Sequence, residues 1–324
     1  MTTATTSAAP LVSIVTPTLN QAAFIEATLV SVMNQDYRPV QHIVVDGGST
    51  DGTLEILERY RDRYDLSWTS GADDGMYEAV NRGMSRATGA ILAYLNSDDL
   101  YLPWTVETVV RRLQQSPAVD VVYGDALLLD EASRRARLAF FPPIATEFLQ
   151  TAFLVQPTVF WRRSAYEAVA GFDVQLRFVG DLDFFIRLGQ RCRFSKIDEV
   201  LAVERHHAAA KTSAYLPEVL LEARDVRSRY ARATGATGRL SRVGVRARGW
   251  IWRRMYWLKF LLAWEGLSRS GDHWARFIEA AHPRVSLARV ALMQVPLIGW
   301  RFANDAIKPS RDWIDRVAGK HGVE

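Results

Sequence analysis

The sequence contains only one cysteine, Cys192, among 324 residues. A single cysteine excludes an internal disulfide framework and any metal site built from several thiolates, and it is typical of a reducing compartment. The chain also lacks an uncharged apolar run of about 18 residues, the length that a helix needs to cross a bilayer. The longest candidates, residues 255–264 and 290–300, are shorter, so we predict no transmembrane helix.

Basic residues are absent from residues 1–37. A secretory signal needs a basic segment followed by an apolar one, and residues 1–9 have neither, so we expect a disordered lead-in there. The chain also lacks the Walker-type glycine-rich loop with its lysine and the dinucleotide-binding glycine spacing. These absences remove the main support for an ATPase or a Rossmann dehydrogenase, and any phosphate must be held by other means.

What the sequence does have is an uneven distribution of charge. Residues 1–223 carry 20 Lys and Arg against 28 Asp and Glu, whereas residues 224–324 carry 20 against 8. Seven of the ten tryptophans also lie in the basic part, between Trp250 and Trp313. The partners expected for a basic, Trp-rich segment are a membrane surface, a nucleic acid or the protein's own acidic face.

The acidic part alternates between two kinds of pattern. Short apolar runs at residues 11–16, 42–45 and 90–95 read as buried strands, and the stretches between them have the spacing of amphipathic helices. This alternation predicts an α/β fold with a doubly wound, mostly parallel, Rossmann-like sheet. The ligand of such a sheet is expected outside the carboxyl ends of the strands.

Polar side chains follow each expected strand, where a ligand would bind. Ser49, Thr50 and Asp51 are better explained as turn and helix-cap residues. Asp98 and Asp99 are different, because two adjacent carboxylates after a buried strand repel one another unless a cation lies beside them, which predicts a hard divalent cation. The polar set comprises Thr16, Pro17, Thr18 and Asn20 after the first strand, Asp46 after the second, and Asn96, Ser97, Asp98 and Asp99 after the third.

Four segments in this order resemble the inverting family 2 glycosyltransferases, which have the GT-A fold. The resemblance spans residues 11–213, which we take as one domain from residue 10 to residue 213. The segments are residues 12–20 (VSIVTPTLN), 44–53 (VVDGGSTDGT), 74–83 (DGMYEAVNRG) with 87–99 (ATGAILAYLNSDD), and 180–188 (GDLDFFIRL).

The resemblance implies a site for a nucleoside-diphosphate sugar and a divalent cation, Mg²⁺ or Mn²⁺. Asn96 departs from the family pattern, because it stands where the first aspartate of the Asp-x-Asp motif is expected and adds no negative charge. By the resemblance, the metal ligands are Asp98, Asp99 and His207, and the donor-binding residues are Thr16, Pro17, Thr18, Asn20, Asp46, Gly47, Asp74, Asn81, Asn96 and Ser97.

The resemblance also places the catalytic base at Asp181, with Gly180 where the family has a glutamate. Asp183 is the competitor, since two residues that are two apart on a helix point about 200° from one another and only one can face the donor. Asp181 is also placed to cap the helix of residues 182–188, which is compatible with catalysis. Gln156 is a further candidate, in a region expected to face the acceptor.

Residues 214–324 are predicted to form a mainly helical, basic region. Residues 250–267 combine tryptophans with scattered basic residues and lack a clean polar face, which suits a helix lying in lipid headgroups. The alternative is a helical cap packed on the preceding domain. We favour association of residues 240–324 with an anionic membrane, because similar enzymes often act on lipid-linked acceptors, and we expect no nucleic acid, since no recognised motif accompanies the charge.

The sequence therefore predicts a metal-dependent inverting glycosyltransferase on the cytoplasmic face of the cytoplasmic membrane. A sugar nucleotide, with a UDP-sugar favoured, is the expected donor, and a glycan or lipid-linked molecule is the expected acceptor in polysaccharide or glycolipid synthesis. Two alternatives are a nucleotidyltransferase, which would need a basic triphosphate loop early in the chain, and an inactive protein that binds nucleotide sugars.

Overall fold

The computed structural model describes residues 9–132, 135–139 and 154–233. The predicted lead-in, apart from its last residue, lies outside the described residues. So does nearly all of the predicted basic C-terminal region, including the proposed membrane-binding residues 240–324.

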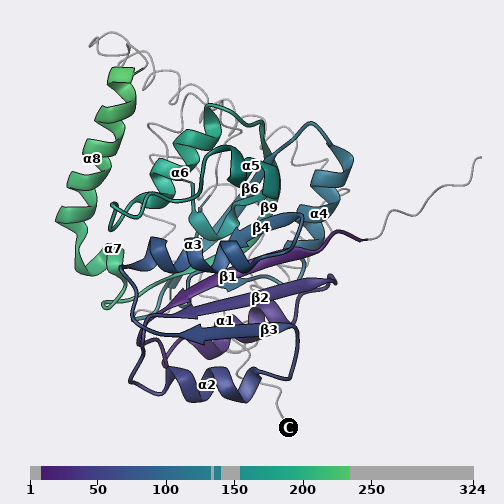
Figure 1. The fold of residues 1–324 in the computed structure, drawn as a ribbon, viewed down its shortest axis with the longest axis vertical. Coiled ribbons are helices and arrows are strands. Elements are labelled where there is room, and N and C mark those ends of the chain that lie inside the picture. Colours follow the sequence, from purple (N-terminus) through teal and green to yellow (C-terminus); the bar gives the residue numbers. More distant parts are fainter. Residues whose placement is uncertain (1–8, 133–134, 140–153, 234–324) are drawn as a thin grey trace, which may run out of the picture.

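The first half of the described chain alternates between strands and helices (Figure 1). Its four strands pair in the order β3-β2-β1-β4, and every pair is parallel. The predicted alternation is therefore confirmed, with one further strand, β3. The elements are β1 (Val12–Thr18), α1 (Ile25–Met33), β2 (Val40–Asp46), α2 (Thr53–Tyr60), β3 (Leu66–Ser70), α3 (Met76–Arg86) and β4 (Ile91–Tyr94).

The second half extends the same sheet, which has nine strands among the described residues. The order continues as β4-β8-β6-β9-β5, with β7 paired to β6, and β8 runs antiparallel to both of its neighbours. The sheet is thus parallel on one side and mixed on the other. The elements are β5 (Leu100–Tyr101), α4 (Thr105–Gln115), β6 (Val121–Asp130), β7 (Arg135–Ala139), the 3₁₀ turn η2 (Gln156–Thr158), β8 (Phe160–Arg162), α5 (Arg163–Ala168), α6 (Gly180–Gly189), β9 (Phe194–His206), α7 (Lys211–Ala214) and α8 (Leu216–Ala233).

Helices cover both faces of the sheet because successive side chains of a strand point to opposite faces. In β1, Val15 packs in one cluster with residues of α3 and α6. Its neighbour Ile14 packs in a second cluster, with residues of α1 and α4. All of these strand side chains are fully buried, and this two-sided core holds the carboxyl ends of the strands in place.

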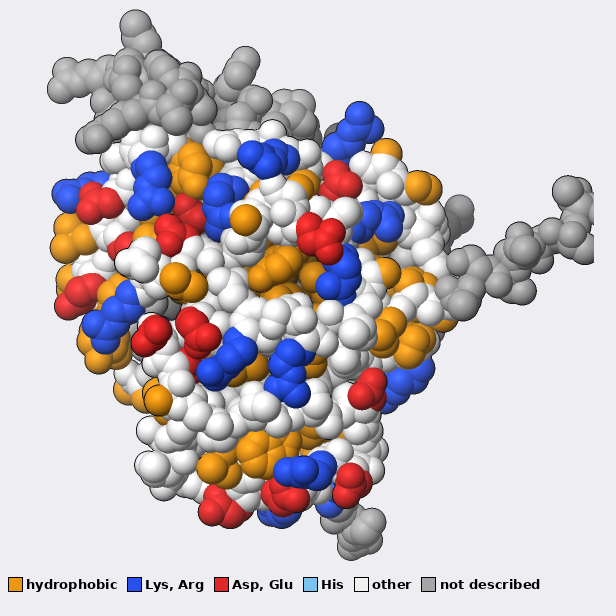
Figure 2. All heavy atoms as spheres, viewed as in Figure 1, with side chains coloured by type: hydrophobic (Ala, Val, Ile, Leu, Met, Phe, Trp, Pro, Cys, Tyr) orange, Lys and Arg blue, Asp and Glu red, His pale blue; other side chains and the backbone are white. Residues whose placement is uncertain are grey.

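Helix α8 lies just beyond the predicted domain boundary at residue 213, yet one of its faces packs on the α/β body. Val219, Ala223 and Val226 are buried in the cluster that also contains residues of α6. The opposite face leaves Leu220 and Leu221 more than half exposed, at 56% and 51%. Figure 2 shows hydrophobic side chains among basic and acidic ones at the margin where α7 and α8 lie, and a similar mixture over the rest of that face.

The part of the chain that the structure describes contains no helix both long and apolar enough to cross a membrane.

Candidate active site

The carboxyl ends of the parallel strands meet at one edge of the sheet. Thr18, the last residue of β1, pairs with Asp46, the last residue of β2. On the other side of β1, Val15 pairs with Tyr94, the last residue of β4, so residues 96–99 leave the sheet beside the β1 loop. The structure therefore brings together the three predicted groups of polar residues, as expected for a parallel sheet.

Asp46 is the centre of the turn after β2. Its side chain is fully buried, and Oδ2 accepts hydrogen bonds from the backbone N–H groups of Gly48 and Ser49, both at 2.9 Å, and from the Ser70 hydroxyl at 2.6 Å. The Ser49 hydroxyl donates to Oδ1. These bonds give Asp46 a structural role in the turn, and its contact with a base stays a prediction.

The β1 loop is bonded to this turn. Asn20, in a left-handed conformation with φ of 53°, donates its N–H to the Ser49 hydroxyl at 2.7 Å and accepts the Thr50 N–H at 2.9 Å. Asp51 accepts N–H groups from Ala22 and from Thr53 at the start of α2. Ser49 and Asp51 therefore stabilise the turn before α2, and they bind the loop after β1 to the loop after β2.

Three further predicted donor-binding residues differ in how their hydroxyl or backbone groups are used. The Thr16 hydroxyl contacts His42 Nε2 at 2.9 Å, and burial lowers the pKa of His42 to about 3, so this pair is neutral. The Ser97 carbonyl accepts a hydrogen bond from Thr28 at 2.8 Å. By contrast, the Thr18 hydroxyl is buried without a hydrogen-bond partner among the described residues, which leaves it available to a ligand.

Asp73, which the sequence reasoning missed, lies closer to the Asp46 turn than the predicted Asp74. Asp73 Oδ1 accepts the N–H of Gly75 at 3.0 Å, and a Cβ added to Gly47 would lie only 2.8 Å from Asp73 Oδ2. The Asp73 carboxylate therefore lies directly beside Gly47, while Asp74 is exposed. The signal in the sequence was the pair Asp73 and Asp74 before Gly75, and it did not show which of the two carboxylates lies beside the Asp46 turn.

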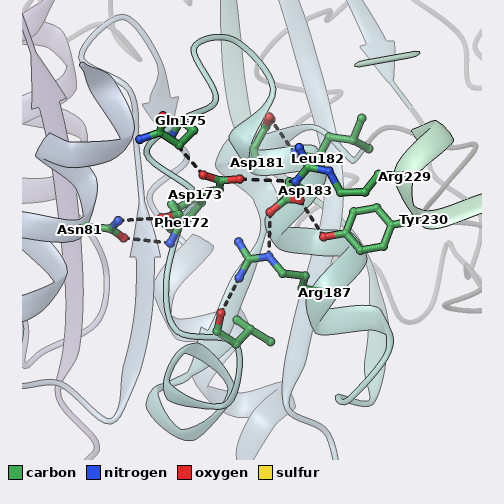
Figure 3. Close-up of polar contacts among 11 residues, drawn as sticks. Asn81, Phe172, Asp173, Gln175, Asp181, Leu182, Asp183, Arg187, Arg229 and Tyr230 are labelled. Carbon is green, nitrogen blue, oxygen red and sulfur yellow. Dashed lines mark hydrogen bonds and ion pairs between the residues drawn. The ribbon is translucent and has the colours of Figure 1, made fainter. Parts of the chain in front are cut away.

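Asn81, predicted to bind the donor, joins α3 to the segment before α6 (Figure 3), and its contact with a donor stays a prediction. Its Nδ2 donates to the carbonyl of Phe172 at 2.8 Å, and its Oδ1 accepts the Phe172 N–H and the Tyr166 hydroxyl, both at 2.9 Å. Gly171, with φ of 74°, has no room for a side chain beside these groups. In this geometry the Asn81 side chain links two distant segments of the chain by hydrogen bonds.

Two predicted metal ligands face each other at the end of β4. Asp98 Oδ2 and His207 Nε2 are 3.1 Å apart, with side chains 20% and 8% exposed. The ring of Phe24 stacks on His207, with centroids 4.1 Å apart, and holds the imidazole beside Asp98. Its neighbour His206 has a different partner, since its Nε2 lies 3.2 Å from Glu204.

Asp99 has a different set of contacts from Asp98. It is 3% exposed, and its Oδ1 accepts the backbone N–H of Arg205 at 2.9 Å. Burial, with the charges of Asp98 and Glu204, raises the pKa of Asp99. The Asp99 carboxylate thus supports the turn from inside the fold.

Arg205, which sequence reasoning did not identify, braces the same turn. Its guanidinium donates to the carbonyls of Asp98 and of Phe24, the second at 3.1 Å, and its Cζ lies 5.1 Å from the centre of the Phe24 ring. The side chain is buried although it is charged, which is costly unless several acceptors surround it. Its position directly before the two histidines was the only signal in the sequence.

The donor set of this turn fits a divalent cation that takes few ligands from the protein. Among the described residues, no three His, Cys, Asp or Glu side chains gather to hold a metal by themselves. Mg²⁺ is typically bound through one or two carboxylates together with substrate phosphates and water. The Asp98 carboxylate matches that pattern, and the His207 nitrogen beside it would be a further ligand for a transition metal ion such as Mn²⁺. The buried Oδ1 of Asn96, which lacks a hydrogen-bond partner among the described residues, is another oxygen donor at the turn.

Gln156 contacts β4 just before this turn. Its Nε2 donates to the carbonyl of Tyr94 at 2.6 Å, while its Oε1 is buried and has no partner among the described residues. The free oxygen agrees with the expectation that this residue lies near a ligand, and its contact with an acceptor stays a prediction.

Asp181 and Asp183 have opposite environments on α6. Asp183 is 1% exposed and is paired with Arg187 at 2.7 Å and with the Tyr230 hydroxyl at 2.7 Å (Figure 3). Asp181 is partly buried, and its Oδ1 accepts the N–H of Leu182 at 2.9 Å and lies 3.4 Å from the Tyr77 hydroxyl. Burial raises the pKa of Asp181 to about 6, so this carboxylate is the better proton acceptor.

Tyr77 explains why glycine precedes Asp181. A Cβ added to Gly180 would lie 2.7 Å from carbons of the Tyr77 ring. The tyrosine ring therefore occupies the space that a glutamate side chain at this position would need, and its hydroxyl reaches Asp181 instead.

Comparison with known proteins gives a consistent result. A family model described as glycosyl transferase family 2 matches residues 13–169. A PGL/p-HBAD biosynthesis glycosyltransferase of Mycobacterium tuberculosis is 33% identical over 189 residues, which cover 56% of this chain and 70% of that protein. An uncharacterized glycosyltransferase of Rickettsia prowazekii is 26% identical over 225 residues, covering 65% and 68%.

Solved structures share the fold at low sequence identity. The structure of S. aureus TarS 1–349 in complex with UDP-GlcNAc matches with a TM-score of 0.57 and 17% identity, covering 96% of this chain and 91% of that one. A mannosyltransferase from Pyrobaculum calidifontis in complex with GDP-Man and Mn²⁺ matches with a TM-score of 0.50 and 19% identity, covering 74% and 79%. These likenesses support the GT-A fold.

Proposed function

The chain belongs to glycosyltransferase family 2, and we propose that it transfers a sugar from a nucleoside-diphosphate sugar to a hydroxyl group of a glycan or lipid-linked acceptor, with inversion at the anomeric carbon. The observation that carries this proposal is the arrangement at the carboxyl edge of the sheet. There, the Asp98–His207 pair lies at the end of β4, and α6 presents Asp181 as a carboxylate with a raised pKa.

Asp181 acts as the general base in this proposal. The acceptor oxygen attacks the anomeric carbon, the bond from that carbon to the diphosphate oxygen breaks, and the acceptor's hydroxyl proton moves to Asp181. A base with a pKa of about 6 is deprotonated near neutral pH and still accepts a proton readily. The hydroxyl of Tyr77, 3.4 Å from Asp181 Oδ1, orients the carboxylate.

Asp98 and His207 would hold a divalent cation, Mg²⁺ or Mn²⁺, with Asn96 beside them and Asp99 supporting the turn from within. When bound, the cation would supply positive charge for the departing nucleoside diphosphate. Arg205 keeps the turn in place by its bonds to the backbone of Asp98.

The donor is proposed to lie along the β1 loop and the Asp46 turn, with a UDP-sugar favoured. Structural neighbours were solved with UDP-GlcNAc and with GDP-Man, which supports a nucleotide sugar as the class of donor. Both uridine and guanosine sugars are therefore included in the screen described below.

We further propose that the protein works at the cytoplasmic face of the membrane, held by residues 240–324. The support is the basic, Trp-rich composition of that region and the exposed Leu220 and Leu221 of the helix that leads into it. Flotation of the full chain and of a chain ending at residue 239 with vesicles of anionic or neutral lipid tests this. Only the full chain should float, and only with anionic vesicles; equal recovery of both chains would contradict the proposal.

A screen of UDP-, GDP- and dTDP-sugars tests the main proposal. Each sugar is incubated with the full chain, with Mn²⁺ or with EDTA, and release of the nucleoside diphosphate is measured. We expect one nucleotide class to be turned over in the presence of the cation only. Binding without any turnover would favour the inactive binding protein, and release of pyrophosphate from a nucleoside triphosphate would favour a nucleotidyltransferase.

A further inference from the structure

Glu222 on α8 contacts the segment that leads into α6. Its Oε1 accepts the backbone N–H of Arg177 at 2.9 Å, and its Oε2 accepts those of Phe178 and Val179 at 2.7 and 2.8 Å. Val179 is the residue at the amino-terminal cap of α6, where backbone N–H groups lack partners within the helix. One carboxylate from a distant helix therefore binds three successive N–H groups directly before the α6 segment that contains Asp181.

The same segment is connected to Asp181 on its other side. The carbonyl of Phe178 accepts a hydrogen bond from the Tyr77 hydroxyl at 3.1 Å, and this hydroxyl also lies 3.4 Å from Asp181 Oδ1. The ring of Tyr77 rests on Gly180. A shift of Phe178 away from Glu222 would therefore move the hydroxyl that orients the proposed base.

Helix α8 is fixed in a position that suits this role. Val219 and Ala223, on either side of Glu222, are buried in the core cluster shared with α6. Two turns further along, Tyr230 donates to Asp183 Oδ1 at 2.7 Å, and Arg229 lies 3.7 Å from the same oxygen (Figure 3). The two helices thus meet through apolar packing, the Glu222 contacts and the Asp183 contacts.

We infer that Glu222 is a positioning residue for Asp181, an inference that rests on the function proposed above. Glu222 does not touch the proposed substrate; it holds residues 177–179 so that Tyr77 and Asp181 keep their geometry. This residue lies outside the segment that matches the family model, residues 13–169. A helix beyond the matched segment therefore completes the environment of the base.

The groups around Asp181 determine what a loosened segment would change. Its pKa is raised by burial first and by the charge of Glu204 on β9, and is lowered by hydrogen bonds from Leu182 and from Tyr77 on α3. Burial, and after it the charge of Asp181, raises the pKa of Tyr94 on β4. Because burial dominates, water admitted by a displaced segment would lower the pKa of Asp181 toward its ordinary value.

Three variants test the inference in the full chain, using the donor that the screen identifies. Glu222→Ala removes all three hydrogen bonds, and Glu222→Gln keeps the size of the side chain but sets an amide N–H₂ against at least one backbone N–H. Glu218→Gln is the matched control, since Glu218 is exposed one turn earlier on the same helix. For each variant we would measure kcat and KM against pH, and amide hydrogen exchange of residues 177–183.

We expect Glu222→Ala to lower kcat about tenfold with little change in donor KM, because a misplaced catalytic group affects the reacting geometry more than binding. The acidic limb of log kcat should shift to lower pH by about half a unit, and amides 177–179 should exchange faster. Glu222→Gln should show smaller changes in the same direction, and Glu218→Gln none.

A purely structural contact would lower the melting temperature and leave the acidic limb unmoved below that temperature, and this result would overturn the inference. If Glu222→Ala does not fold, the acidic limb of Glu222→Gln decides the question. A wild-type chain that turns over no nucleotide sugar would instead count against the proposed function, so the two failures are distinguishable.

Discussion

The two sides of the candidate site differ in how their polar groups are satisfied. On the turn side, formed by Asn20, Ala22 and residues 46–53, Asp46 accepts hydrogen bonds from Gly48, Ser49 and Ser70, and the loops bind one another. On the reaction side, formed by residues 96–99, 181 and 205–207, buried Asn96 Oδ1 lacks a partner among the described residues and the pKa of Asp181 is raised.

This difference has a physical consequence for stability and for ligand binding. Internally satisfied groups rigidify a loop and stabilise the fold, whereas incompletely satisfied groups cost stability in the free protein and gain partners when a ligand binds. We therefore expect substitutions on the turn side to act mainly on stability, and substitutions on the reaction side to act mainly on turnover.

The largest effect is expected for Asp181→Asn, a loss of about a thousandfold in kcat, because an amide cannot accept the proton of the acceptor. Initial rates of nucleoside diphosphate release measure it. Asp183→Asn is the matched control, since Asp183 lies on the same helix but is paired with Arg187 and Tyr230. The control should lose stability and keep most of its turnover; equal losses of turnover would contradict the assignment of the base.

Asp98→Asn is expected to lower turnover about a hundredfold and to raise the Mn²⁺ concentration needed for half-maximal activity, because the cation loses its anionic ligand. A titration with Mn²⁺ at saturating donor measures both effects. Glu107→Gln, an exposed carboxylate on α4, is the control and should change neither. Activity of Asp98→Asn that equals the wild type in EDTA and in Mn²⁺ alike would refute a metal role for this residue.

Asp46→Asn tests the turn side and should destabilise the fold by about 2 to 3 kcal/mol, because an amide N–H₂ would face backbone N–H donors in a buried position. Urea unfolding at pH 7 measures the change. Asp74→Asn serves as the exposed control and should shift stability by less than about 0.5 kcal/mol. An unchanged stability of Asp46→Asn would remove the contrast between the two sides.

Sequence patterns predicted the elements and turns whose signals are local. The strands β1, β2 and β4 follow from continuous apolar runs, and Ser49 and Asp51 were predicted as turn and cap residues because their partners lie nearby in the sequence or in the adjacent loop. Strand β3 was missed, since only Leu66 of its five residues is buried and the apolar signal is weak.

Contacts between distant segments left no such signal. Arg205 bonds to the backbone of Asp98, 107 positions away, and Glu222 bonds to residues 43 to 45 positions away. Asn81 looked like a ligand residue in its motif, yet its partners are Phe172 and Tyr166. The residue types were visible in the sequence, but their partners depend on how β9, α6 and α8 come together.

The smallest expected effect is on the free energy of unfolding, and its sign distinguishes the two sides of the site. Asp181→Asn should stabilise the fold at pH 7 by about 2 kcal/mol. Burial raises the pKa of Asp181 from 3.8 to about 6. Between these values the unfolded chain binds fewer protons than the folded one, so wild-type stability falls as pH rises through this window. Asparagine removes that loss, and the gain should vanish below about pH 4. Urea unfolding at pH 4 and pH 7 measures it, and a gain independent of pH would contradict the raised pKa. Since Asp46→Asn is expected to destabilise at pH 7, the same replacement would have opposite effects on stability on the two sides, because the buried Asp46 carboxylate accepts several hydrogen bonds whereas burial raises the pKa of Asp181.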